Sequence, residues 1–214
     1  AAWARRIQSG QAGAFMTRTL TGMALEATTK MFGDWTDNVA AGALPEVPER
    51  PKGQERNVVI SQWDWADPTA YLHDVVSTDR RNPTVNANGK LYGSLEESHD
   101  YLPVLDPVTH QIDRVPLTMM DESTGPASGK QLAESPMWGT EDVWDSRANV
   151  HNPMLDEEGR VWITARVRDR DNPDWCKAGS SHPSAMAYPL EASGRQLGLY
   201  NPVSGQYKHI DTCF

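Results

Sequence analysis

The feature that most constrains the fold of this chain is a twelve-residue pattern that occurs twice, at residues 82–93 and again at 152–163. An Asn-Pro pair and a later Gly are identical in the two copies, and most other positions hold residues of the same type. Self-similarity of this kind usually means that one supersecondary unit is used more than once. The pattern therefore predicts a repeat architecture, although it names no reaction.

Turn and strand signals around each copy predict four short antiparallel strands per unit. In the first copy we expect a strand that ends at Val85, a hairpin turn at 86–89, and strands at 90–92, 102–105 and 111–117. In the second copy we expect strands at 152–155, 160–168, 196–200 and 206–211, with an insertion at about 169–194. Residues 58–65 also have a strand-like composition. Four antiparallel strands form one blade of a β-propeller, so we expect a mainly β fold containing a partial β-propeller.

The first quarter of the chain differs in composition. Residues 1–44 contain apolar positions without β-branched runs, which predicts a short N-terminal helical segment interrupted by glycines. Residues 45–56 contain three prolines and predict a stiff linker. We therefore expect three parts: a helical segment at 1–44, a linker at 45–56 and an incomplete propeller at 57–214. Because the chain stops where another unit should begin, we expect it to be an internal fragment of a longer protein.

Composition excludes two classes of protein. The formal net charge of −9 argues against a general nucleic-acid binder, which normally has a basic face. No run of 18 apolar residues is present, so we expect no membrane span. The 16 glycines and 15 prolines are usual for a turn-rich β protein.

Cys176 and Cys213 are the only cysteines, which is too few for a zinc site. A disulfide between them implies an oxidising compartment, whereas two free thiols are typical of a cytosolic protein. We expect the disulfide, because each Cys closely follows a segment of the second repeat.

The second repeat resembles a known blade. Its Asn-Pro-Met-Leu-Asp-Glu-Glu-Gly-Arg-Val-Trp-Ile-Thr-Ala stretch, followed by Gln-Leu-Gly-Leu-Tyr-Asn-Pro-Val-Ser-Gly-Gln-Tyr, is similar to blades of streptogramin (virginiamycin B) lyase-like propellers. The chain further resembles exported bacterial proteins that join a carboxypeptidase-regulatory-like β-sandwich, a c-type haem-like segment and such a propeller. The stretch from Trp3 to Gly42 resembles the part that follows the haem motif. The resemblance implies a periplasmic or extracellular location and a c-type haem in an upstream segment.

His151 is the candidate catalytic residue. It precedes the second Asn-Pro pair, whereas the first copy has Arg81 at that place. In the lyases that the chain resembles, a His at a comparable position assists catalysis or binds a divalent metal beside a Glu. We do not expect two blades to supply the complete His/Glu/His set of those lyases. The alternative is a structural His that forms hydrogen bonds between blades.

Other polar residues have two interpretations each. Arg81, Asn82 and Asn152 are candidate ligand-binding groups, and the alternative is hydrogen bonding at strand ends. Two acidic groups either bind a hard cation or form solvated loops. The first comprises Glu96, Glu97, His99 and Asp100. The second comprises Asp64, Asp67, His73, Asp74 and Asp79. Three methionines are either axial haem ligands or packing residues; they are Met16, Met23 and Met31.

Together these features favour a ligand-binding or lyase-like propeller module of an exported bacterial protein. Its expected partners are a small-molecule or carbohydrate ligand and the remainder of its own longer chain, and a divalent metal is a candidate cofactor. The alternative is a non-enzymatic propeller that is redox-linked to a haem domain or serves protein interactions.

Overall fold

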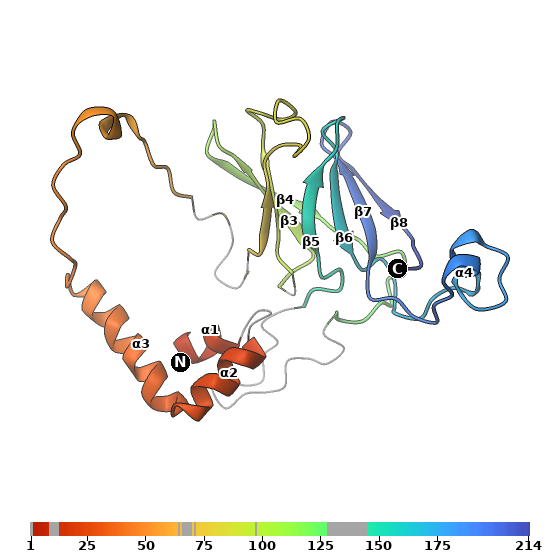
Figure 1. The fold of residues 1–214 in the computed structure, drawn as a ribbon, viewed down its shortest axis with the longest axis horizontal. Helices are drawn as coiled ribbons and strands as arrows, with labels where there is room; N and C mark the ends of the chain where they lie inside the picture. Colours follow the sequence, from red (N-terminus) through yellow and green to blue (C-terminus); the bar gives the residue numbers. More distant parts are fainter. Residues whose placement is uncertain are drawn as a thin grey trace. The chain divides into compact units, whose positions relative to one another are not determined.

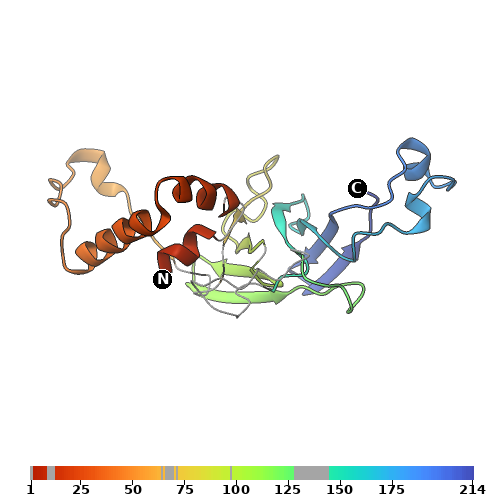
Figure 2. The same ribbon diagram turned by 90° about the horizontal axis from the view of Figure 1, so that it is seen from below.

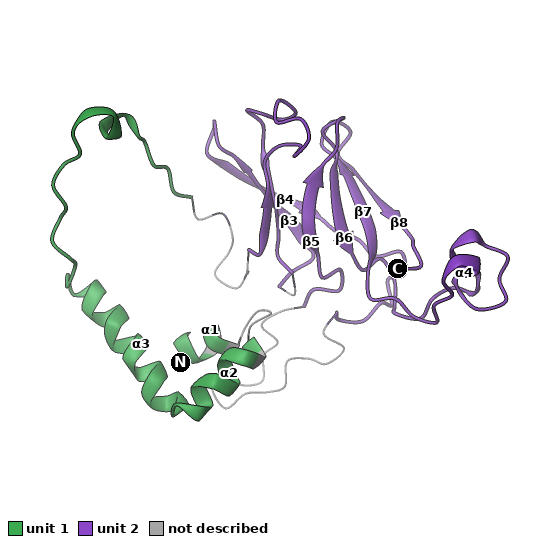
Figure 3. Ribbon diagram, in the orientation of Figure 1, with its two compact units in different colours: residues 1–64, 134–141 green, residues 65–133, 142–214 purple. Residues whose placement is uncertain are grey.

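The structure is a computed structural model that describes residues 2–8, 13–63, 65, 70, 72–96, 98–127 and 145–214. It is mainly β, with two four-stranded antiparallel sheets and a few short helices (Figure 1). The chain forms two compact units, residues 1–64 with 134–141 and residues 65–133 with 142–214 (Figure 3).

The first unit is helical, as expected for residues 1–44. It contains α1 (Ala2–Gln8), α2 (Gly13–Gly22) and α3 (Leu25–Ala40), followed by a short 3-10 helix η1 (Gly53–Asn57). Trp3 stacks on Phe32 with ring centroids 5.0 Å apart, and its indole nitrogen donates a hydrogen bond to Thr36. None of the described helices has both the length and the apolar content needed to cross a lipid bilayer.

The strand expected at 58–65 is absent from its described residues. Residues 58–63 have no regular structure, and Val58, Val59 and Ile60 are each at least 68% exposed. Their β-branched side chains suit a strand, but a strand also requires a neighbouring strand as hydrogen-bonding partner. No described strand pairs with them.

Both sheets lie in the second unit. Sheet 1 has the order β1 (Asp74–Val76), β2 (Leu91–Ser94), β3 (Tyr101–Asp106) and β4 (Gln111–Pro116). Sheet 2 has the order β5 (His151–Leu155), β6 (Val161–Ala165), β7 (Gln196–Asn201) and β8 (Gln206–Ile210). Seven of these strands lie close to their expected positions, and the two sheets have the same strand order.

The sequence repeat predicts the first strand of sheet 1 at the wrong position. Residues 83–88 form turns, and the strand lies earlier, at β1. Asp74 pairs with Ser94, and His151 pairs with the equivalent Thr164. Asp74, and not Arg81, therefore holds the ladder position of His151. The mismatch arises because the β1–β2 loop at 77–90 is longer than the β5–β6 loop at 156–160, so the Asn-Pro pairs match in sequence but not in register.

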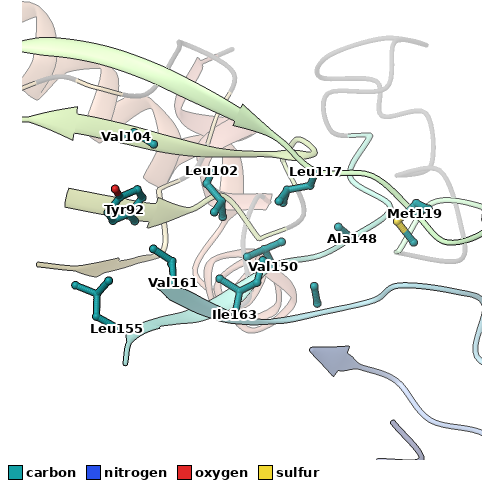
Figure 4. Close-up of a cluster of buried hydrophobic side chains, with 11 residues drawn as sticks. Tyr92, Leu102, Val104, Leu117, Met119, Ala148, Val150, Leu155, Val161 and Ile163 are labelled. Atoms are coloured by element: carbon teal, nitrogen blue, oxygen red, sulfur yellow. The ribbon is translucent and has the colours of Figure 1, made fainter. Parts of the chain in front are cut away.

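The two sheets pack face to face through a hydrophobic core (Figure 4). Alternation along β6 sends Val161, Ile163 and Ala165 into this core, each at most 1% exposed. Sheet 1 contributes Tyr92, Leu102 and Val104, and the connection between the sheets contributes Leu117, Met119, Ala148 and Val150. The first strands, β1 and β5, are in contact. No closed ring of sheets is formed by the described residues.

The insertion between β6 and β7 is held by the expected disulfide. It contains η2 (Asp174–Cys176) and α4 (Pro183–Ala187), and it extends from sheet 2 beside the C-terminal residues (Figures 1 and 2). Cys176 and Cys213 are bonded and both buried. Arg168 reinforces the attachment, because its guanidinium donates to Asp211, to the side chain of Asn172 and to the carbonyl of Thr212.

Candidate functional site

Four ionisable side chains converge where the first strands of the two sheets begin. His73 precedes β1, Asp74 opens β1, Glu96 follows β2, and His151 opens β5. Contact between β1 and β5 brings these segments together, and an isolated bridge joins Glu96 to Val150. The site therefore exists only because the two sheets pack against each other.

The two imidazole rings lie between two carboxylates. They meet edge to face, with centroids 4.7 Å apart. The Nδ1 atoms of His73 and His151 lie 3.0 and 3.6 Å from Oδ2 of Asp74. On the opposite edge, Nε2 of His73 lies 3.9 Å from Oε2 of Glu96, and Nε2 of His151 lies 3.4 Å from Oε1. Each histidine thus presents one ring nitrogen to each carboxylate.

Burial differs across the site. The side chains of Glu96 and His151 are 3% and 5% exposed, whereas those of His73 and Asp74 are 21% and 28% exposed. Solvent therefore reaches the site from the edge formed by His73 and Asp74. Within the described residues, Oε2 of Glu96 and Nε2 of His151 are buried without a hydrogen-bond partner. Buried polar atoms without partners are rare in folded proteins and often mark functional positions.

Asp74 is held in the ionised state. Burial acts to raise the pKa of Asp74, but the backbone N–H of Asn152, the hydrogen bond of His73 and the charges of both histidines outweigh burial and lower it. The N–H of Asn152 lies 2.9 Å from Oδ2, and the Ser94 hydroxyl donates to the same oxygen at 3.3 Å. A carboxylate with this environment is negatively charged at neutral pH.

The backbone around the site is strained. Glu96, Asn149 and Asn152 all have positive φ, at 50°, 42° and 51°. Asn adopts this conformation readily, but Glu does not. A residue such as Glu96 in this conformation costs on the order of 1–3 kcal/mol, and such positions gather at functional sites. At Asn152 the positive φ accompanies a register shift between His151 and Met154. The conformation of Asn152 also places its N–H against Asp74.

The donor set fits a divalent cation. His73, Asp74 and His151 each offer one ligand atom, and these atoms lie within 4.8 Å of one another. Two imidazoles and one carboxylate suit metals such as Zn²⁺, Mn²⁺ and Fe²⁺. Glu96 lies on the Nε2 edge, where a carboxylate typically accepts the second N–H of a metal-bound histidine.

The structure separates the sequence-predicted site residues. His151 lies in the cluster, and Asn152 contributes its backbone N–H while its side chain is exposed. Arg81 and Asn82 lie in the β1–β2 loop, beyond the opposite end of β1 from Asp74. Arg81 pairs there with Asp79, and the Asn82 side chain accepts hydrogen bonds from Thr84. Neither residue approaches His151.

The members of the two acidic groups also lie at different places in the structure. Asp100 accepts hydrogen bonds from the backbone N–H groups of Arg147 and Ala148, which fixes the connection into β5. His99 pairs with Asp145 at 2.9 Å, outside the cluster. Glu97, Asp64 and Asp67 lie outside the described residues.

From the sequence, the other members of the cluster had two interpretations, a hard-cation site or a solvated loop. The signal that could have found them is a His-Asp pair directly before a strand and a Glu directly after the next strand. The two sheets bring together two histidines and a glutamate.

Comparisons of the chain with protein-family models, with curated proteins and with solved structures found no match. The resemblance to streptogramin lyase-like propellers therefore rests on the sequence motifs alone.

Proposed function

We propose that this protein binds a divalent metal at His73, Asp74 and His151, with Glu96 as the supporting carboxylate, and that the centre serves a ligand-binding or lyase-like module of an exported bacterial protein. The observation that carries the proposal is the convergence of three donor atoms beside a buried glutamate with an unpartnered oxygen. The two sheets are then adjacent blades of a partial β-propeller. Their shared strand order and the contact between their first strands support that interpretation.

The geometry assigns different tasks to the residues. A bound metal would polarise an oxygen of the ligand as a Lewis acid. His151 is almost fully buried, which suits a metal ligand better than a base that must reach a substrate. His73 and Asp74 form the exposed edge, so a small ligand reaches the centre beside them. Glu96 fixes both rings with their Nδ1 atoms directed at Asp74.

The disulfide supports an oxidising compartment, in keeping with an exported protein. The resemblance suggests a periplasmic or extracellular location, and a disulfide that remains bonded in protein isolated from that compartment would support it.

Metal titration tests the proposal. The purified chain is stripped with a chelator, refilled with Zn²⁺, Mn²⁺ or Mg²⁺, and measured by isothermal calorimetry and by elemental mass spectrometry after desalting. We expect one saturable equivalent, which His73→Ala and His151→Ala both abolish.

His99→Ala is the matched control, because His99 is 22% exposed, close to the 21% of His73, and also lies beside an aspartate. It should bind metal as the unmodified chain does. The proposed centre would be refuted if His99→Ala lost as much metal binding as His73→Ala, or if the unmodified chain showed no saturable metal binding.

The second candidate function is a non-enzymatic interaction module. The helical unit exposes Phe15, Met23, Met31 and Trp35, each at least 59% exposed, and an apolar surface of this kind suits protein contacts. If the propeller is linked to a c-type haem domain, a protein that contains both would show a Soret band. Metal binding without any turnover of candidate substrates would favour this second function.

A further inference from the structure

The outer face of sheet 2 carries apolar side chains that the described residues leave at least partly exposed. Alternation along the strands sends one set of side chains away from the core that the two sheets share. Their apolar members are Met154, Trp162, Leu197, Leu199 and Ile210, none of which is buried. Met154 is 55% exposed, and the other four are partly buried. Apolar side chains that gather on one partly exposed sheet face are a feature of interaction surfaces.

This face is equivalent to one that is already packed. The strand registers relate the five outer positions of sheet 2, in the order given above, to Val76, Tyr92, Leu102, Val104 and Val115 of sheet 1. Those five residues form or flank the hydrophobic core, where they meet the inner face of sheet 2. In Figure 4, Tyr92 and Leu102 lie across from Val161 and Ile163. Every position that sheet 1 uses to bind the next sheet is thus also apolar in sheet 2.

The opposite end of the two-sheet stack is closed. On the outer face of sheet 1, a Cβ added at Gly93 would meet side-chain atoms of Leu72, Pro103 and Trp65. Leu105, on the same face, is 1% exposed. Residues of the segment before β1 therefore cover sheet 1. The two ends of the stack therefore differ. The outer face of sheet 1 is covered by its own chain. The outer face of sheet 2 resembles the face that sheet 1 packs against sheet 2.

We propose that the outer face of sheet 2 is a docking surface for a further four-stranded antiparallel sheet. The facing side of that sheet would resemble the inner face of sheet 2. That inner face combines Leu155, Val161, Ile163 and Ala165 with Tyr200 and Tyr207. The contact repeats an interface already present in the molecule, and the metal centre takes no part in it.

The closest available probe is a second copy of sheet 2, because its inner face already fits a surface of this type. The chain is extended after Phe214 by a flexible linker and a second copy of residues 148–214. The linker is comparable in length to the connection at 117–150. Met154→Cys in the first copy supplies the reporter thiol, since the described chain contains no free cysteine. Its rate of alkylation measures how far the outer face is covered.

We expect alkylation to be at least tenfold slower in the extended chain than in the unextended one. Leu199→Lys in the first copy should restore the faster rate while circular dichroism shows both sheets folded. Met186→Cys, on α4 and 73% exposed, is the control whose rate should not change.

Equal rates with and without the extension would overturn the proposal, and so would an appended copy that stays unfolded. The proposal would also be overturned if the extension slows alkylation of Met154→Cys and Leu199→Lys does not restore the faster rate. If Met154→Cys is instead protected in the unextended chain as protein concentration rises, the occupant is a second copy of this chain, and the proposed sheet is wrong.

Discussion

Replacing Glu96 by Gln should weaken metal binding while leaving the metal-free protein at least as stable. Gln keeps the shape of the side chain but removes the negative charge that faces both Nε2 atoms. Loss of a carboxylate that supports metal-bound histidines typically lowers metal affinity 10–100-fold, or about 1.4–2.7 kcal/mol. The direct ligands are unchanged, so binding should weaken and not disappear.

The metal-free protein should respond in the opposite direction. Glu96 is 3% exposed, and one of its oxygens lacks a hydrogen-bond partner among the described residues. A buried polar group without a partner costs about 1–3 kcal/mol, and more when it is charged. Removing the charge relieves part of that cost, so we expect the free energy of unfolding in urea with chelator to stay equal or increase.

The assay for affinity is competition with a fluorescent chelator, followed by urea unfolding with and without metal. Glu122→Gln is the control, because Glu122 loses the same charge from a side chain that is 83% exposed. The reasoning fails if both variants weaken binding equally. It also fails if Glu96→Gln destabilises the metal-free protein by more than it weakens metal binding.

Three further outcomes follow from the structure. Replacing Cys176 and Cys213 together by Ser should lower the free energy of unfolding by about 4 kcal/mol from a loop of 37 residues, measured in urea without reductant. Ile163→Ala should cost about 2–5 kcal/mol because Ile163 is 1% exposed in the core, whereas Met154→Ala on the exposed face should cost far less. Because the pKa of Asp74 is lowered by folding, its charge stabilises the fold above the unfolded-state pKa of about 4 and stops doing so as pH falls through the folded-state pKa. The stability lost in Asp74→Asn should therefore shrink below about pH 4 in acid–urea titrations.

The strands of the second repeat could be predicted because their turns carry local signals. Asp156 accepts the N–H groups of Glu158 and Arg160 in the β5–β6 turn, and Gly159 supplies the positive φ of 74°. Turn chemistry of this kind is encoded within a few residues. The first strand of sheet 1 depends instead on a loop whose length no local pattern fixes.

The candidate site could be predicted only in part for a similar reason. His151 stands out because it departs from the repeat, but its partners lie 55 or more positions earlier in the chain. They approach it only through the contact between β1 and β5 and through the left-handed conformation of Glu96. That conformation is unusual for Glu and has no sequence signature.

The repeat also explains how two similar sheets make an asymmetric site. Asp74 and His151 occupy the same ladder position, opposite Ser94 and Thr164, and their side chains meet where β1 contacts β5. Because the two positions hold a carboxylate and an imidazole, sheet 2 adds a second imidazole to the His73–Asp74 pair that sheet 1 supplies.

The docking surface lies on the other side of sheet 2 from this site, so the two proposals predict independent outcomes. Leu199→Lys acts on the outer face and should leave metal affinity unchanged, while His151→Ala should leave the alkylation rate of Met154→Cys unchanged in the extended chain. Coupled loss of both properties in either variant would mean that sheet 2 had unfolded, and both tests would then have to use milder substitutions such as Leu199→Thr and His151→Gln.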